Sequence, residues 1–395
     1  GRRGGSGGGA RPRGVRAWGT NRDWSRDRCS RRSILGTEAF LEMSLDIGPH
    51  FERLSRAKRC QWRAIQKGWR SAIEQRERMA KSFGADQLPM GDAAVVVFGS
   101  LARGELTTSS DVDWTLLIDG RADAAYLGVV NQIRTSFYKK LKLVSPGPSE
   151  MFGGMTYAHD LVHDIGGVRD HSHNMSRRLL LVLESSELSS SSSSSPVVSD
   201  RVIRQILQRY VIQDGSFSSY RTSPRIPRFF LNDVVRFWRS MAVDYAAKYT
   251  ERGSDKWALR NIKLRMSRKL LFVKGLWMSL SMGMEDRALK TNDQIVEHLW
   301  NSARQPALES LSHMINAVAP KSGRKAFDAY NWFLGMLDDP KRRKALETLS
   351  PAEAISAKEF LEARKHAERF DAELREVLFE KNKKFSRVVK QYGVF

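Results

Sequence analysis

Two aspartates separated by one residue, Asp111 and Asp113, are the strongest chemical signal in this 395-residue sequence. We expect them on a β-strand, where side chains two residues apart lie on the same face. Neighbouring carboxylates repel each other, and a hard divalent cation such as Mg²⁺ or Mn²⁺ relieves that repulsion. The pair is therefore predicted to bind a metal ion.

A Gly-Ser turn lies ten residues before this pair. The apolar run 93–98 predicts a strand that ends at Gly99 and Ser100. Glycine lets the backbone approach a phosphate closely, while a serine hydroxyl and the following N–H groups can hold phosphate oxygens. A metal pair beside a phosphate cradle predicts a site for a metal-bound polyphosphate.

The spacing of these residues resembles the DNA polymerase β-like nucleotidyltransferase superfamily. Its signature here reads Phe98-Gly99-Ser100, ten further residues, and Asp111-Val112-Asp113-Trp114. The fuller string GSLARGELTTSSDVDWTLL is similar to bacterial protein-PII uridylyltransferases and related nucleotidyltransferases. The resemblance implies metal-dependent transfer of a nucleoside monophosphate from an NTP to a hydroxyl of a protein or small molecule, with release of pyrophosphate.

The resemblance also implies a third carboxylate on a neighbouring strand. Residues 155–167 are expected to form that strand and end in a Gly-Gly turn. Asp160 takes the position of the Asp in the corresponding uridylyltransferase-like segment, so we assign it as the third catalytic and metal-binding acid. Asp164 lies four residues later on the same predicted face and is the alternative. Either acid could instead have a capping or salt-bridge role.

Two histidines flank Asp160 with a different metal spacing. His159 and His163 imitate the His-Glu-x-x-His arrangement that binds zinc on a helix. The central acid is Asp rather than the longer Glu, and the segment is predicted to be a strand. We therefore favour a role for these histidines in orienting carboxylates, in contacting substrate, or in hydrogen bonding within a domain interface.

The triphosphate is expected to be held between the α/β part and a helical part, as in the resembling family. Lys263 and Ser267, one turn apart on a predicted helix over 257–284, resemble a Lys/Ser pair that holds β- and γ-phosphates. Arg103, just after the Gly-Ser turn, is assigned to the same task. For each residue the alternative is a solvated helix face.

The composition agrees with a polyanionic ligand but is less specific. The net charge is +22, which favours nucleotides, RNA or an acidic protein as partners. Two cysteines give no disulfide framework, so we expect a reducing cytoplasm. The most apolar stretch, 270–284, contains Lys274 and is too short and polar to span a membrane.

The sequence predicts an α+β fold in which a small mixed-sheet nucleotidyltransferase domain precedes an all-helical domain. The expected divisions are a Gly/Arg-rich arm over 1–42, the nucleotidyltransferase domain with an N-terminal helix over 43–188, a Ser-rich linker over 189–199 and the helical domain over 200–395. The arm is expected to be unstructured, with Met43 as a sensible start, and an RNA-binding role is its alternative. Further helices are expected over 48–83, 122–143, 174–188, 232–248, 293–318, 323–337 and 356–392.

Two other functions fit the same residues. An RNA-terminal nucleotidyltransferase is favoured by the positive charge and the Arg-rich arm. A non-catalytic nucleotide-binding regulator or toxin–antitoxin partner is the second alternative. The presence of Asp111, Asp113 and Ser100 argues against it, because a binding module does not need both metal carboxylates.

Overall fold

A computed structural model describes most of the chain from residue 46 onward. The described segments are 46–83, 91–146, 151–188, 198–217, 226–252, 256–284 and 291–393. The predicted arm over 1–42 and residues 189–197 of the predicted linker lie outside them. The four proposed divisions of the chain therefore stay a prediction.

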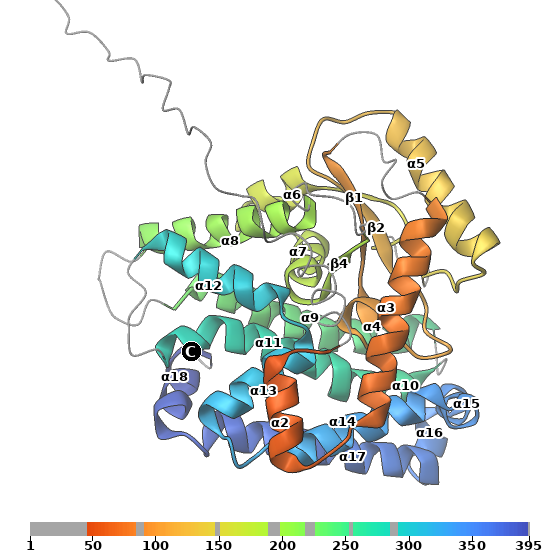
Figure 1. The fold of residues 1–395 in the computed structure, drawn as a ribbon, viewed down its shortest axis with the longest axis vertical. Coiled ribbons are helices and arrows are strands. Elements are labelled where there is room, and N and C mark those ends of the chain that lie inside the picture. Colours follow the sequence, from red (N-terminus) through yellow and green to blue (C-terminus); the bar gives the residue numbers. More distant parts are fainter. Residues whose placement is uncertain are drawn as a thin grey trace, which may run out of the picture. The chain divides into compact units, whose positions relative to one another are not determined.

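Four short strands form one mixed sheet in the order β3-β2-β1-β4 (Figure 1). β1 (Ala93–Val97) runs antiparallel to β2 (Trp114–Ile118) and to β4 (Ser186–Glu187), whereas β3 (Met155–Tyr157) runs parallel to β2. Val97 pairs with Trp114, so the residues after β1 and before β2 meet at one end of the sheet. This sheet and the helices that follow it confirm the predicted fold class.

Both faces of the sheet are covered by helices. Every residue of β1 and β2 is buried, which explains why these strands are apolar throughout instead of alternating with polar residues. On one face, Val95 and Trp114 pack with α3 (Arg63–Phe83) and α5 (Ala125–Arg134), which a π-helix extends over Thr135–Lys140. On the other face, Val96 belongs to the core that includes α6 (Ala158–His163) and α7 (Ser172–Glu184).

The second half of the described chain is helical. Its α-helices are α8 (Val198–Phe217), α9 (Arg228–Arg252), α10 (Trp257–Lys263), α11 (Lys269–Leu280), α12 (Asn292–Arg304), α13 (Ala307–Val318), α14 (Arg324–Asp338), α15 (Pro340–Thr348), α16 (Pro351–Ala354), α17 (Lys358–Phe379) and α18 (Lys383–Gly393). A π-helix (Leu264–Arg268) joins α10 to α11, and a short 3₁₀ helix (Ser281–Gly283) follows α11. Across the described residues, every helix is too short or too polar to cross a membrane.

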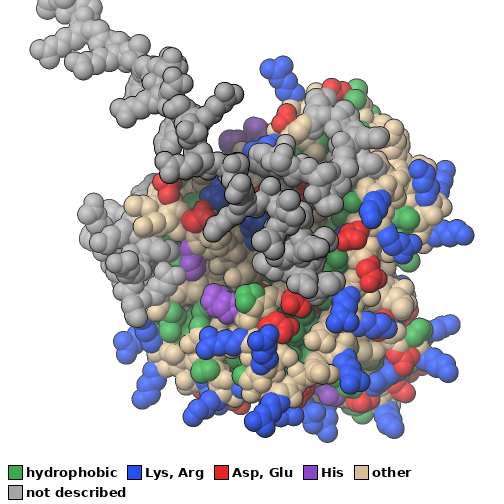
Figure 2. Space-filling view, viewed as in Figure 1, with side chains coloured by type: hydrophobic (Ala, Val, Ile, Leu, Met, Phe, Trp, Pro, Cys, Tyr) green, Lys and Arg blue, Asp and Glu red, His purple; other side chains and the backbone are tan. Residues whose placement is uncertain are grey.

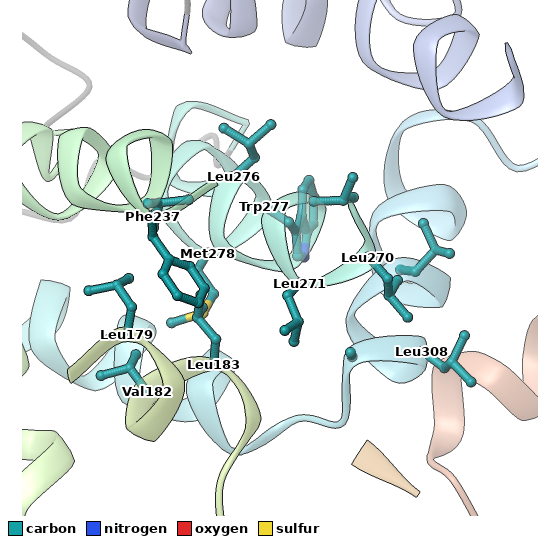
Figure 3. Close-up of a cluster of buried hydrophobic side chains, with 14 of the residues drawn as sticks. Leu179, Val182, Leu183, Phe237, Leu270, Leu271, Leu276, Trp277, Met278 and Leu308 are labelled. Atoms are coloured by element: carbon teal, nitrogen blue, oxygen red, sulfur yellow. The ribbon is translucent and has the colours of Figure 1, made fainter. Parts of the chain in front are cut away.

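α11 lies at the centre of the helical half because it is apolar on nearly all sides. Ten of its residues are buried, as expected for a helix with neighbours all round. In Figure 3, Met278 of α11 lies beside Leu183 of α7 and Phe237 of α9, and all three belong to one buried cluster. The core of the helical half is therefore continuous with the core beneath the sheet.

The N-terminal helices pack against C-terminal ones as well as against the sheet region. α2 (Pro49–Lys58) packs on α13, and α3 contacts both α14 and the short helix α4 (Gly99–Arg103). The Trp62 indole donates to Asp328 at 2.8 Å, and the Ala64 N–H donates to Asn331 at 2.9 Å. These bonds fix the helix that lies behind the Gly-Ser turn.

Several sequence-based boundaries were wrong, for local reasons. The helix predicted over 48–83 is two helices, because Arg59 adopts a left-handed backbone conformation with φ of 52°. The predicted helix over 293–318 is likewise interrupted at Pro306, whose missing N–H and fixed φ favour a break. The helix predicted over 356–392 ends at Phe379 and a new one begins at Lys383.

The strand predicted over 155–167 was also wrong, since only Met155–Tyr157 is extended and α6 follows directly. β2 begins at Trp114, so Asp111 and Asp113 precede the strand rather than lying within it.

A buried carboxylate on α13 offers a test of this packing. Glu309 accepts the N–H of His50 at 2.9 Å and of Phe51 at 2.8 Å, and thereby caps the start of α2. Glu309→Ala should lower the free energy of unfolding by about 1–3 kcal/mol, because these N–H groups lose their acceptor. Glu297→Ala removes a half-exposed ion pair with Arg204 and should cost less than about 1 kcal/mol in the same urea titration. Equal effects would show that Glu309 does not anchor α2.

Candidate active site

The Gly-Ser turn lies directly against the aspartate pair. After β1, the Phe98 N–H donates to the Asp113 carbonyl at 2.9 Å, which extends the pairing of β1 with β2 by one residue. Gly99 has φ of +66°, and a Cβ atom there would be 3.1 Å from Asp113 Oδ2. Glycine is required at this position both by the left-handed backbone and by the close carboxylate. Ser100 follows it in the first turn of α4.

Asp111 and Asp113 alternate with buried residues, as the sequence predicted. Val112 is 2% exposed and Trp114 is fully buried, whereas Asp111 is exposed and Asp113 is half-buried. Burial of Asp113 and the negative charge of Asp111 raise the pKa of Asp113 to about 7. A cation bound beside the two carboxylates would relieve both effects.

Two cations from the helical half face this pair. Positive charge on Arg268 and Lys263 lowers the pKa of Asp113 and opposes the effects of burial and of Asp111. Burial lowers the pKa of Lys263 to about 8, and Asp111 partly offsets that effect. Lys263 ends α10 and Arg268 ends the π-helix that directly follows it, so both cations come from one continuous helical stretch.

A buried glutamate joins the two halves behind these cations. Glu184, at the end of α7, is 4% exposed and accepts a hydrogen bond from Arg268 at 3.1 Å. Its other carboxylate oxygen bonds the Arg103 guanidinium of α4. These cations hold the pKa of Glu184 below its usual value despite the opposing effect of burial. Glu184 therefore stays charged and holds Arg268, whose positive charge acts on Asp113.

Residues 76–146 match the family described as "Nucleotidyltransferase domain". This part of the chain is a polymerase β-like nucleotidyltransferase domain. The match includes β1, α4, β2 and α5, and with them the Gly-Ser turn and the aspartate pair. Among the curated proteins compared with the chain, none matches it.

Two residues that were assigned to phosphate binding from the sequence form hydrogen bonds within the protein. Arg103 of the nucleotidyltransferase domain is 7% exposed and donates to Glu105 at 2.8 Å as well as to Glu184. Ser267 is buried, and its hydroxyl donates to the Lys263 carbonyl at 3.3 Å. Lys263 thus interacts electrostatically with the aspartate pair, while Arg103 bonds Glu184 behind it and Ser267 bonds its own helix.

The structure does not bring Asp160 or Asp164 to the aspartate pair. β3 runs parallel to β2, and α6 begins where β3 ends beside Ile118. Asp160 therefore lies beyond the opposite end of the sheet. The length of β2, about 16 Å, separates that end from the aspartate pair. Its side chain is 64% exposed beside His159, while Asp164 is 3.4 Å from Arg169. The expectation of an acid on a neighbouring strand fails because the strand ends at Tyr157.

Neither Glu184 nor Arg268 was assigned to the site from the sequence. Glu184 ends the apolar run LLLVLE, and an acid at the end of a buried helix core is a usable signal for a paired charge. Arg268 lies in the helix predicted over 257–284, where regular helical spacing paired Lys263 with Ser267 instead. The π-helix over Leu264–Arg268 has no evident signature in the sequence.

The donor set of the aspartate pair fits Mg²⁺. This ion is commonly held by one or two carboxylates together with substrate phosphates and water. Asp111 and Asp113 supply the carboxylates, and Gly99 keeps the space beside Asp113 Oδ2 clear. Within the described segments, no cluster of three or more His, Cys, Asp or Glu side chains gathers in a metal-binding arrangement. Remaining ligands would come from the substrate and solvent.

The raised pKa of Asp113 predicts a pH-dependent stability in metal-free buffer. A folded pKa of about 7, against 3.8 normally, means that the folded state binds the extra proton between those values. The Asp113 contribution should therefore make stability fall from pH 4 to pH 7. Asp113→Asn should remove that contribution and raise the free energy of unfolding at pH 8 by on the order of 2 kcal/mol.

The matched control for this pH experiment is Asp293→Asn, a change at an exposed residue of α12. Its unfolding curve should follow that of the unmodified protein at every pH in EDTA. If the unfolding curves of Asp113→Asn also followed those of the unmodified protein from pH 4 to pH 8, the pKa of Asp113 would not be raised in the folded state.

Proposed function

We propose that the protein transfers a nucleoside monophosphate from an NTP to an acceptor hydroxyl and releases pyrophosphate. The proposal rests on one observation. Asp111 and Asp113, beside the Gly-Ser turn, interact electrostatically with Lys263 and Arg268. Carboxylates for a metal on one side and cations on the other suit a metal-bound triphosphate. The match to the nucleotidyltransferase domain supports the same reaction class.

Each residue has a distinct role in this proposal. Asp111 and Asp113 hold the divalent metal, which supplies charge neutralisation at the phosphates when it is bound. Ser100 and the backbone of the Gly-Ser turn hold phosphate oxygens. Lys263 and Arg268 contact the β- and γ-phosphates and stabilise the charge of the departing pyrophosphate. Glu184 and Arg103 act as positioning residues, because they reach the substrate only through Arg268.

The acceptor is proposed to be a protein side chain or a small molecule. An RNA end is the alternative and would call for a continuous basic surface. On the face in Figure 2, Lys and Arg side chains are spread along the helices and interspersed with Asp and Glu. Incubation with each labelled NTP and cell extract separates the outcomes, since label should enter protein or small molecules rather than RNA.

The metal pair gives the first activity test. Asp111→Asn and Asp113→Asn should each abolish nucleotide transfer at saturating Mg²⁺, whereas thermal unfolding should show a folded protein. Neither carboxylate supports the apolar core, so loss of folding is not expected. Near-normal transfer by either variant would contradict the site. A protein that binds NTP but transfers no label in any assay would favour the regulatory alternative.

Lys263 gives a binding test with an internal control. Lys263→Ala should weaken NTP binding by about 1.5–3 kcal/mol, the range for a charge-assisted hydrogen bond, or about tenfold to a hundredfold. Binding of the nucleoside monophosphate should hardly change, because it lacks the β- and γ-phosphates. Arg265→Ala, an exposed change in the same π-helix, should leave both affinities unchanged in calorimetric titrations. Similar losses for NTP and monophosphate would contradict the assigned contact.

A further inference from the structure

The loop between α4 and β2, residues 104–110, leads directly into the proposed metal pair. The backbone after Asp111 is fixed, because the Val112 N–H donates to the Val144 carbonyl at 3.1 Å. Asp111 itself is exposed and lies between that bond and the loop. The position of the Asp111 carboxylate therefore depends on how the loop is held.

The last four residues of the loop, 107–110, form a closed turn. The Ser110 N–H donates to the Thr107 carbonyl at 3.1 Å, and the Thr107 N–H donates to the Ser110 hydroxyl at 3.1 Å. The two hydroxyl oxygens are 3.0 Å apart and share a further hydrogen bond. Asp111 follows this turn directly, so contacts that hold the turn also hold the start of the metal pair.

The helical half bonds this loop at three points. The three hydrogen bonds are Tyr330 hydroxyl to Glu105 at 2.6 Å, Thr108 N–H to Asp338 at 3.2 Å, and Arg343 Nη1 to Thr107 Oγ1 at 3.4 Å. Asp338 ends α14 and Arg343 lies in the first turn of α15. Only these two side chains bond the closed turn itself, since the first bond goes to Glu105, the partner of Arg103.

Arg343 is itself held in place. Its side chain is 11% exposed, and its Nε donates to Glu347 at 2.9 Å. Lys263 has a pKa lowered chiefly by burial, and the positive charge of Arg343 lowers it further. Arg343 therefore bonds the turn that precedes Asp111 and also acts on a cation of the proposed nucleotide site.

Asp338 uses its two carboxylate oxygens for different partners. Oδ1 accepts the Thr108 N–H, while Oδ2 accepts a hydrogen bond from Lys67 Nζ at 2.6 Å. The Lys67 side chain is 65% exposed, so this ion pair contributes little to stability. The bond to Thr108 is the one that connects Asp338 to the metal pair through the closed turn.

We propose that Asp338 and Arg343 are positioning residues that hold the turn over 107–110 and thereby set the place of Asp111 in the metal site. They touch neither metal nor substrate and act only through the turn. Without them, the Asp111 carboxylate has to be ordered when the metal binds, which weakens binding. The inference rests on the proposed function in one respect, that Asp111 is a metal ligand.

The first test measures Mn²⁺ binding to the full chain by electron paramagnetic resonance, without nucleotide. Asp338→Ala should weaken Mn²⁺ binding about two- to tenfold, the loss expected for one hydrogen bond. Asp338→Asn should restore the affinity of the unmodified protein, because its amide oxygen still accepts the Thr108 N–H. Lys67→Ala is the matched control, since it removes only the exposed ion pair and should leave the affinity unchanged.

A second pair of variants tests α15. Arg343→Met should weaken Mn²⁺ binding by a similar factor, because it removes the donor to Thr107. Lys344→Met, a change at the neighbouring exposed residue of the same helix, should bind Mn²⁺ as the unmodified protein does.

Hydrogen exchange in metal-free buffer gives a readout that depends on neither metal nor activity. The amides of residues 107–112 should exchange faster in Asp338→Ala and Arg343→Met, and at the unmodified rate in Asp338→Asn and in both controls. Unchanged exchange in Asp338→Ala and Arg343→Met would overturn the proposal.

The proposal would also be overturned if Asp338→Asn lost as much Mn²⁺ affinity as Asp338→Ala, because charge and not the hydrogen bond would then be responsible. Either of these results leaves the proposed function to its own tests. Mn²⁺ binding that persists undiminished in Asp111→Asn would instead contradict the metal site, and with it both the proposed function and this inference.

Discussion

A single buried carboxylate, Glu184, connects the two parts of the protein that meet at the site. A charge in this position is tolerated only when cations compensate it, and Arg103 from α4 and Arg268 from the helical half do so. The chain Glu105–Arg103–Glu184–Arg268 continues to α14, because the Tyr330 hydroxyl donates to Glu105 at 2.6 Å. The arrangement of the proposed nucleotide site therefore depends on a continuous set of buried charges.

Burial perturbs the pKa values of an acid and a base that interact at the proposed nucleotide site. Asp113 is half-buried beside Asp111, which raises its pKa, while Lys263 is desolvated and has a lowered pKa. Each perturbation disfavours the charged form of its group, and a metal-bound triphosphate would relieve both by adding a cation near the aspartates and an anion near Lys263. Perturbed groups of opposite sign in one place are typical of functional sites.

The sequence predicted the part of the site that is local along the chain. Gly99, Ser100 and the aspartate pair lie within 15 residues, just after β1 and just before β2, so the alternation of side chains and the chemistry of the turn were enough to bring them together in the prediction. Lys263 was assigned from a resemblance, and its electrostatic interaction with Asp111 supports the contact proposed above. Glu184 and Arg268 depend on packing between distant helices and on a π-helix, neither of which has a periodic signature. The prediction of Asp160 failed because a strand was extended past its true end at Tyr157.

The most direct test of the central claim is a crystal structure with Mn²⁺ and an NTP that cannot be cleaved between its α- and β-phosphates. Anomalous scattering locates the metal independently of the protein atoms. The account predicts a Mn²⁺ peak between Asp111, Asp113 and the phosphates, with the β- and γ-phosphates against Lys263 and Arg268. A triphosphate bound elsewhere on the protein, or a metal that does not contact Asp111 and Asp113, would contradict it.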